Sequence, residues 1–315
     1  MSGIRIGLSL GGAFPQGVPP AGSLLAAARH AEQAGFDALW SGDHVMMYSP
    51  IVDCVTLLAA FAGVTRRVSV GTAVYLVPLR HPVVTAKIFA GLDYVSNGRL
   101  VFGAGVGGEF AREFEAVGVP HRERGSRTDE GLEIIRLLWS EPRASFAGRH
   151  FRFADVALEP RPIQRPHPPI WIGGRSEAAL RRTARFARGW LAYMATPERI
   201  RTSTARIRDL APGFGRAPDD IEAGLLLFAF IGRDRETARG RVIADLSTRY
   251  NQPFEGLVDR YCAFGTPAQC AESIERFVAA GVSELVVKLT CAPDEQLDQQ
   301  SALAEGVLPL LRPAR

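Results

Sequence analysis

Two polar residues follow directly on a predicted buried strand: Asp43 and His44 come after DALWS at 37–41. A neutral imidazole can accept or release a proton near pH 7, and a carboxylate beside it can fix its tautomer or bond to a ligand. The pair therefore predicts an acid–base site in which His44 moves the proton and Asp43 orients it or contacts a cofactor. The alternative is an Asp-His pair that only ties a loop to the end of its strand.

A second candidate site is the stretch PPIWIGGRSEAAL at 168–180, where Gly173 and Gly174 stand between a strand and a helix. The free N–H groups and the dipole of a helix N-terminus attract anions, and glycines let a ligand approach the backbone closely. The stretch therefore predicts a phosphate site on the amides of 174–176. The side chains expected to add contacts are Arg175, Ser176 and Thr196. The alternative is a tight turn in which Ser176 is only an N-cap.

A third candidate, Glu109, follows a glycine-rich run at 105–108 that ends another predicted strand. A carboxylate at the mouth of a pocket can act as a catalytic acid. The same residue type is also common at a solvated helix start, where the helix dipole favours a negative charge. Both interpretations of Glu109 stay open.

The elements that must position these residues alternate between short apolar runs and amphipathic segments. The runs lie at 4–10, 37–41, 68–74, 100–105, 170–173, 190–194, 224–231 and 284–289. Near-continuous apolar strands separated by helices predict a parallel sheet covered on both faces. Eight such units in about 300 residues predict a (β/α)8 TIM barrel, whose active site lies at the C-terminal ends of the strands. All the candidate residues fall there.

Two segments interrupt this alternation, one at 142–168 after strand four and one at 250–265 before the last helix and strand. Long insertions in a barrel are expected on the catalytic face, where they form lids and substrate walls. The chain has no internal repeat and no linker-like tract, so residues 1–315 are expected to form a single domain.

Composition and charge exclude several classes of protein. The 315 residues are 47% hydrophobic and 22% charged, which is the ordinary composition of a soluble globular protein. The formal charge of +4 comes from scattered arginines, with Lys87 and Lys288 as the two lysines, so a nucleic-acid partner is not expected. No apolar run reaches the roughly 20 residues of a membrane span, and the N-terminus does not have the layout of a signal peptide. A cytoplasmic protein without membrane contact is expected.

The four cysteines show neither CxxC spacing nor histidines nearby, which predicts free thiols and no metal site. They are Cys54, Cys262, Cys270 and Cys291.

Longer stretches carry a family pattern. They are FDALWSGDHV at 36–45, SVGTAVYLVPLRHPVVTAKIFAGLDYVSNGRLVFGAGVG at 69–107, REFEAVGVPHRERGSRTDEGLEIIRLLW at 112–139, PRPIQRPHPPIWIGG at 160–174 and FGTPAQCAESIERFVAAGVSELVV at 264–287. Together they resemble the bacterial luciferase-like superfamily, and most closely its branch of F420-dependent oxidoreductases. Members that use FMN share most of this framework.

The resemblance implies a deazaflavin ring across the strand ends, with its phosphate at the helix after strand five and His44 against its reactive face. It implies a non-proline cis peptide at Ala73–Val74 that supports the ring. It further implies that a glycine run offers backbone groups to the ring: Gly105, Val106 and Gly107. Close relatives commonly have Trp after that run, where this chain has Glu109, so the resemblance does not extend to the substrate.

The leading hypothesis is an F420-dependent oxidoreductase that transfers a hydride between the deazaflavin C5 and a small organic substrate, as a homodimer. The alternative is a monooxygenase that receives reduced FMN from a separate flavin reductase, with the insertion at 142–168 as its lid. A third hypothesis is a flavin-binding relative without catalysis.

Overall fold

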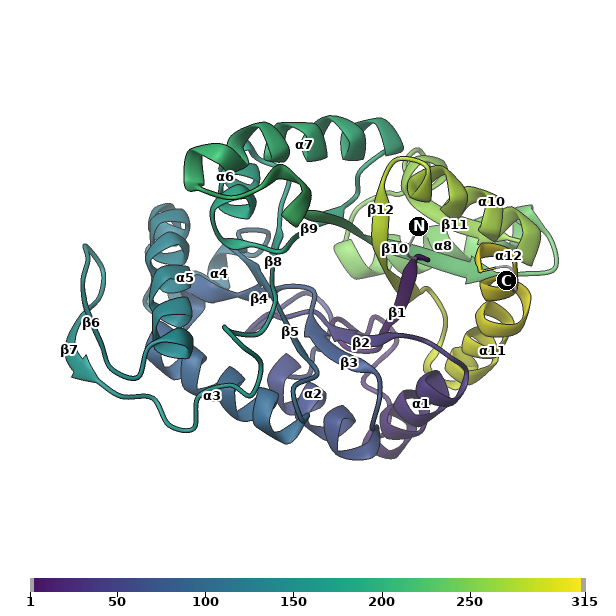
Figure 1. Cartoon of the computed structure of the whole chain (residues 1–315). Coiled ribbons are helices and arrows are strands. Elements are labelled where there is room, and N and C mark those ends of the chain that lie inside the picture. Colours follow the sequence, from purple (N-terminus) through teal and green to yellow (C-terminus); the bar gives the residue numbers. More distant parts are fainter. Residues whose placement is uncertain (1–2, 313–315) are drawn as a thin grey trace.

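Eight parallel strands close into a barrel in the computed structural model, which describes residues 3–312 (Figure 1). They are β1 (Arg5–Ser9), β2 (Ala38–Ser41), β3 (Ser69–Thr72), β5 (Leu100–Gly105), β8 (Ile170–Gly173), β9 (Gly189–Tyr193), β10 (Glu222–Ile231) and β12 (Val282–Leu289). Each pairs with the next in that order, and β12 pairs with β1 to close the ring. The predicted (β/α)8 barrel is confirmed, and each predicted apolar run overlaps one of its strands.

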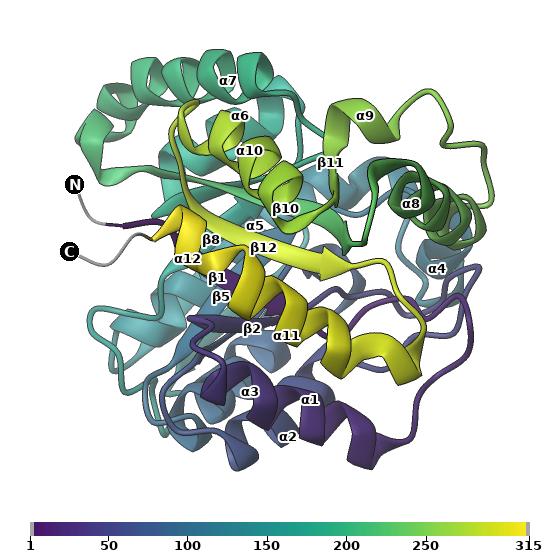
Figure 2. The same cartoon turned by 90° about the vertical axis from the view of Figure 1, so that its right-hand side faces the viewer.

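Helices form the outer layer of the barrel (Figures 1 and 2). They are α1 (Ala21–Gln33), α2 (Cys54–Val64), α3 (Pro82–Val95), α4 (Ala111–Ala116), α5 (Arg124–Ser140), α6 (Glu177–Phe186), α7 (Pro197–Leu210), α8 (Arg235–Tyr250), α9 (Val258–Tyr261), α10 (Pro267–Val278), α11 (Gln296–Gly306) and α12 (Leu308–Leu311). Local sequence sets several of their starts. Thr266, for example, begins α10 with a capping box, in which its side chain and that of Gln269 satisfy each other's backbone N–H groups.

The strands follow a two-residue alternation that decides what reaches the barrel interior. On β12, Leu285 and Val287 pack outward into the large core beneath the helices. Val286 packs inward, in a cluster with Trp40 and Trp171. By the same alternation, Lys288 lies on the inner face near the C-terminal end of this strand.

The insertion at 142–168 forms a hairpin of β6 (Ala144–Ala147) and β7 (Arg152–Val156) that projects outside α5 (Figure 1). Glu130 of α5 holds its turn, because the Glu130 carboxylate accepts hydrogen bonds of 2.8–3.2 Å from the backbone N–H groups of residues 149–151. None of the described residues in this insertion lines the cavity at the strand ends. The expectation that this insertion covers the catalytic face is therefore not met.

The insertion at 250–265 contains α9 and the short strand β11 (Cys262–Gly265), which pairs in parallel with the C-terminal part of β10. Apolar residues of this insertion pack against α8 and form a second apolar cluster, which includes Phe228, Phe254 and Phe264. Of this insertion, Tyr250 alone among the described residues lines the cavity.

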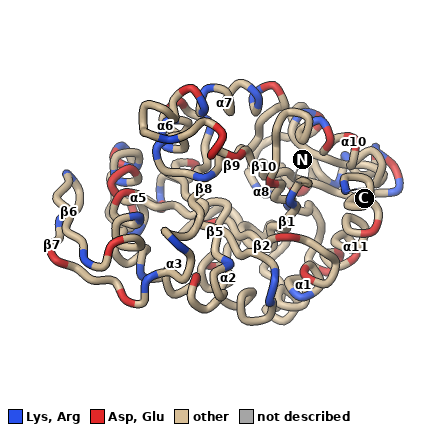
Figure 3. Tube along the Cα trace, viewed as in Figure 1, with Lys and Arg blue, Asp and Glu red and all other residues tan. Residues whose placement is uncertain are grey.

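Charged residues of both signs are spread over the helices and loops around the barrel (Figure 3). Within residues 3–312, none of the helices has the length and apolar character needed to cross a membrane.

Candidate active site

A cavity of about 360 Å³ opens at the C-terminal ends of the barrel strands. Figure 2 shows α4 and α8 on this side of the molecule, toward which the arrow of β12 points. The predicted site residues that line the cavity are Asp43, His44, Ala73, Val74, Gly105, Val106, Gly107, Glu109, Gly173, Gly174 and Arg175. Two predicted residues, Ser176 and Thr196, are not among those that line it.

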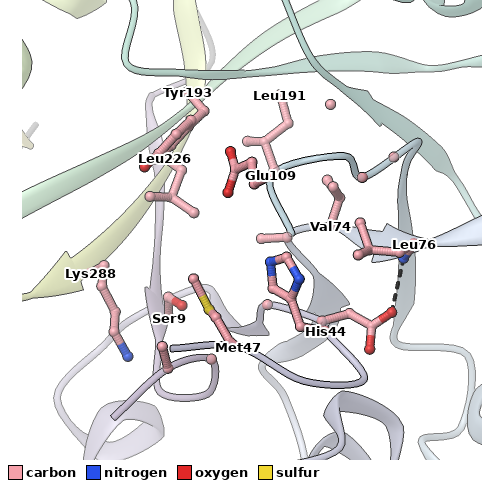
Figure 4. Close-up of a pocket in the computed structure, with 18 of the residues that line it drawn as sticks. Ser9, His44, Met47, Val74, Leu76, Glu109, Leu191, Tyr193, Leu226 and Lys288 are labelled. Atoms are coloured by element: carbon pink, nitrogen blue, oxygen red, sulfur yellow. Dashed lines mark hydrogen bonds between the residues drawn. The ribbon is translucent and has the colours of Figure 1, made fainter. Parts of the chain in front are cut away.

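His44 lies in this cavity (Figure 4). Glu113 of α4 holds its imidazole ring. The Nδ1 atom of His44 is 3.0 and 3.2 Å from the two carboxylate oxygens of Glu113, which also accepts a 3.1 Å hydrogen bond from the backbone N–H of Val45. The Glu113 side chain is fully buried. Because a carboxylate can only accept, Nδ1 carries a proton, and in the neutral ring Nε2 is left free to accept one.

The charges around His44 favour its protonated form. Burial by itself lowers the pKa of the imidazole, but the hydrogen bond and charge of Glu113 and the charges of Glu109 and Asp43 outweigh it. The net result is a pKa raised above the usual histidine value. His44 is therefore placed to take up a proton at a pH near neutrality.

The Asp43 carboxylate makes no hydrogen bond to the imidazole, so it does not fix the tautomer of His44, while its contact with a cofactor remains a prediction. Its buried carboxylate accepts hydrogen bonds from both terminal nitrogens of Arg80, at 2.6 and 2.9 Å, and from the backbone N–H of Leu76 at 2.9 Å. These contacts tie the loop after β2 to the segment after β3. The residue that orients His44 is Glu113, and Asp43 fixes the wall beside it.

Strand three is interrupted at the cavity. β3 ends at Thr72, the Ala73–Val74 peptide bond is cis as the resemblance implies, and the chain resumes in β4 (Tyr75–Leu76), which pairs with β5. This bulge places the Val74 side chain in the mouth of the barrel (Figure 4).

The glycines around the bulge make room for Val74. A Cβ on Gly105 would lie 2.4 Å from Val74 Cγ2, and a Cβ on Gly173 would lie 3.0 Å from Val74 Cγ1. Gly174 has a φ of +113°, in a region that other residues rarely adopt. Packing thus explains the first glycine of the pair, and backbone conformation explains the second. The same features keep the backbone at the cavity wall free of side chains.

The backbone beyond these glycines is able to receive an anion. Among the described residues, the N–H groups of 174–176 donate to no backbone or side-chain acceptor. The Arg175 guanidinium lies over the next strand end, where it donates to the Met194 carbonyl at 3.0 Å. Ser176 and Thr196 serve as N-caps of α6 and α7, accepting from the N–H groups of Ala179 and Arg199 at 3.2 Å. Their direct contact with a phosphate remains a prediction.

These features fit a flat, phosphate-bearing cofactor of the flavin or deazaflavin type. An apolar bulge, a glycine-lined wall and a set of free N–H groups follow one another along the strand ends. A Cβ on Gly105 or Gly173 would fill the space that Val74 and a ring would share. Apolar walls with a few polar groups are typical of cofactor sites.

The wall opposite the bulge is mixed in character (Figure 4). It contains Tyr193, Leu226 and Lys288, with Glu109 projecting from the α4 side at the mouth. Glu109 is exposed, as expected for either of its two interpretations. Burial raises the pKa of the Tyr193 hydroxyl well above its usual value, so this group stays protonated.

Glu113 was missed by the sequence analysis, which placed the acid–base pair within two adjacent residues. Glu113 stands 69 residues from His44, and its surroundings are those of an ordinary amphipathic helix. The available signal was its place four residues after Glu109, close behind the end of a barrel strand, where catalytic residues of such barrels lie.

Comparison with known proteins places this site in a family. A profile of the luciferase-like monooxygenase family matches residues 4–284. The chain is 29% identical over 295 residues to an FMNH2-dependent dimethylsulfone monooxygenase from Pseudomonas putida, covering 82% of this chain and 78% of that protein. It is 28% identical over 314 residues to an F420-dependent glucose-6-phosphate dehydrogenase from Microbacterium testaceum, covering 90% and 91%.

A solved monooxygenase from Streptomyces bottropensis superposes on the chain with a TM-score of 0.83 and 27% identity, over 97% of this chain and 99% of that one. The sequence match and the shared barrel agree over nearly the whole length. The chain belongs to the luciferase-like monooxygenase family and is an oxidoreductase of that family.

Proposed function

We propose that the chain is an F420-dependent oxidoreductase acting on an alcohol or carbonyl group of a small organic substrate. The observation that carries this proposal is the His44–Glu113 pair, which presents a basic Nε2 to the cavity. Similarity to an F420-dependent dehydrogenase over 90% of the chain supports it.

In this mechanism His44 accepts and donates the proton. The Glu113 carboxylate holds Nδ1–H, so that Nε2 accepts the proton of a substrate hydroxyl as the carbon loses its hydride. Glu113 then stabilises the imidazolium that results. When bound, the deazaflavin supplies the redox chemistry, taking up or returning a hydride at C5. In the reverse direction, protonated His44 donates to the carbonyl oxygen.

The residues proposed to hold the cofactor follow the order of the strand ends. The bulge at Ala73–Val74 would support the ring, and the backbone at 105–107 would offer its polar groups to the ring. The amides of 174–176 and the Arg175 side chain receive the phosphate. Glu109, at the mouth, is a second proton donor or acceptor within reach of the solvent.

An FMN-dependent monooxygenase is the second candidate, favoured by the similarity to the Pseudomonas putida and Streptomyces bottropensis enzymes. It requires a separate flavin reductase and a site closed against water. The hairpin at 142–168 does not provide that closure, because it projects outside α5. With either cofactor, a homodimer is part of the proposal by analogy with the family.

Titration of the purified chain with F420 and with FMN, each followed by fluorescence, tests the proposal. Binding of F420 at micromolar concentration or below, with FMN at least tenfold weaker, is expected. The opposite preference would overturn it in favour of the monooxygenase.

A further inference from the structure

One basic side chain in the cavity is not used by the proposed mechanism. Lys288, one of two lysines in the chain, interrupts the apolar run of β12. Strand alternation puts it on the inner face with Val286. It lines the cavity on the side opposite His44, with Met47 and Ser9 between the two residues (Figure 4). Apolar residues are the usual filling at such a barrel position.

The ammonium of Lys288 has one hydrogen-bond partner among the described residues, the carbonyl of Gly11 at 3.0 Å. A lysine has three N–H donors, so two remain for a ligand. No carboxylate in residues 3–312 lies within 4.0 Å of it. Asp245, whose negative charge acts on Lys288, is engaged by both Nε and Nη2 of Arg249 at 2.9–3.1 Å.

This neighbourhood carries a surplus of positive charge. Burial, together with the charge of Arg249, lowers the pKa of Lys288 to about 7, and Asp245 and Cys291 offset this only in part. With Lys288 protonated, the two cations and one carboxylate sum to one positive charge. A buried charge of this kind is favourable only with a partner of opposite sign.

We propose that Lys288, with Arg249 beside it, binds the carboxylate of an acidic substrate at the side of the cavity away from His44. A monoanion matches the single surplus charge, whereas a dianionic phosphate would leave one negative charge unpaired. Lys288 and Arg249 also line a second, smaller hollow of about 40 Å³, which Phe14 lines as well. The carboxylate subsite therefore lies where the two hollows meet, and the chain prefers hydroxy acids or oxo acids over neutral alcohols and ketones.

This assignment rests on the proposed function only in making His44 the reacting end of the substrate. Binding of an acid at Lys288 is measurable without turnover. A failure of the subsite and a failure of F420-dependent chemistry are therefore distinguishable.

The test compares benzoate with benzamide, which have the same shape and differ in charge, by calorimetric titration of the full chain with and without bound cofactor at pH 6.5. Benzoate is expected to bind about tenfold more tightly, the magnitude of one charge-assisted hydrogen bond. Lys288→Met is expected to abolish this preference, and Lys288→Arg to retain it. The matched control is Lys87→Met, which removes the other, exposed lysine and keeps the preference. Equal binding of both probes, or tighter binding of inorganic phosphate, would overturn the assignment.

A second measurement needs no substitution at Lys288. With lysine ε-carbons labelled, the chain gives two NMR signals, which Lys87→Met assigns. The Lys288 signal is expected to titrate near neutral pH and to shift to higher pH when benzoate is added, because the anion favours the ammonium. The titratable and charged groups that face Lys288 are Asp245, Arg249 and Tyr250 on α8 and Cys291 after β12. A Lys288 titration unmoved by benzoate would contradict the proposal.

Discussion

Replacing Glu113 by glutamine tests the main structural claim about the site. The amide keeps a hydrogen-bond acceptor for Nδ1 of His44 but removes the buried negative charge. Hydrogen bonds to charged groups contribute about 1.5–3 kcal/mol, so turnover is expected to fall by roughly 10- to 100-fold. The loss should appear in kcat more than in KM, since Glu113 stabilises the imidazolium that forms during reaction.

The pH profile gives the sharper readout. Oxidation of an alcohol needs neutral His44, so activity rises with pH through the pKa of that imidazole. Glu113 raises this pKa, and Glu113→Gln should therefore move the rising limb toward lower pH. The assay is anaerobic reduction of F420 at saturating alcohol, measured between pH 5 and 9.

The matched control is Glu115→Gln, an exposed carboxylate on the same helix. Its turnover and pH profile should equal those of the unmodified chain. The orienting role of Glu113 would be refuted if Glu113→Gln left both the turnover and the rising limb of the pH profile unchanged. An equal effect of Glu115→Gln would also refute it. Thermal unfolding of each variant separates this effect from loss of fold, because Glu113 also holds the backbone of Val45.

Three further predictions concern other parts of the barrel. His44→Ala should lower turnover by about two to four orders of magnitude while F420 affinity stays within about threefold; unchanged turnover would remove His44 from the mechanism. Arg80→Met leaves the buried Asp43 carboxylate without its charged partner and should lower the free energy of unfolding by about 3–5 kcal/mol in urea titrations; a loss below about 1 kcal/mol would contradict this. Burial raises the pKa of Glu284 to about 7 from 4.5, so the folded state binds the extra proton and stability should fall by about 3 kcal/mol as pH rises from 4.5 to 7. Glu284→Gln should remove that loss, and an identical pH dependence of the melting temperature in the variant would be evidence against it.

Much of the fold was predictable because parallel barrel strands are buried on both faces. Runs such as LVFGAG at 100–105 and ELVVKL at 284–289 are therefore apolar almost throughout, and each marks a strand. The strand ends then follow directly, which is why His44 and the glycine pair at 173–174 could be identified before the structure.

The contacts between distant segments were not predictable in the same way. Glu113 reaches His44, and Arg80 reaches Asp43, only because separate loops converge at the barrel mouth. Local pattern describes each of these residues as an ordinary surface charge. The direction of the hairpin at 142–168 likewise depends on non-local interactions, among them the hydrogen bonds of its turn to Glu130 and of His150 to Ser126 on α5.

Lys288 could be read from the sequence, but its position inside the barrel could not. A lysine near the end of an apolar run is equally compatible with a solvent-exposed strand terminus. Its position on the inner face, beside Arg249 and without a carboxylate partner among the described residues, emerges only from the closed barrel.

The most direct test of the account is anaerobic reduction of F420 by the purified chain with a panel of alcohols and hydroxy acids, followed by the absorbance of the oxidised cofactor. The account predicts substrate-dependent reduction that needs no oxygen and is lost in His44→Ala. Absence of any F420 reduction, together with oxygen consumption that depends on reduced FMN and substrate, would contradict it.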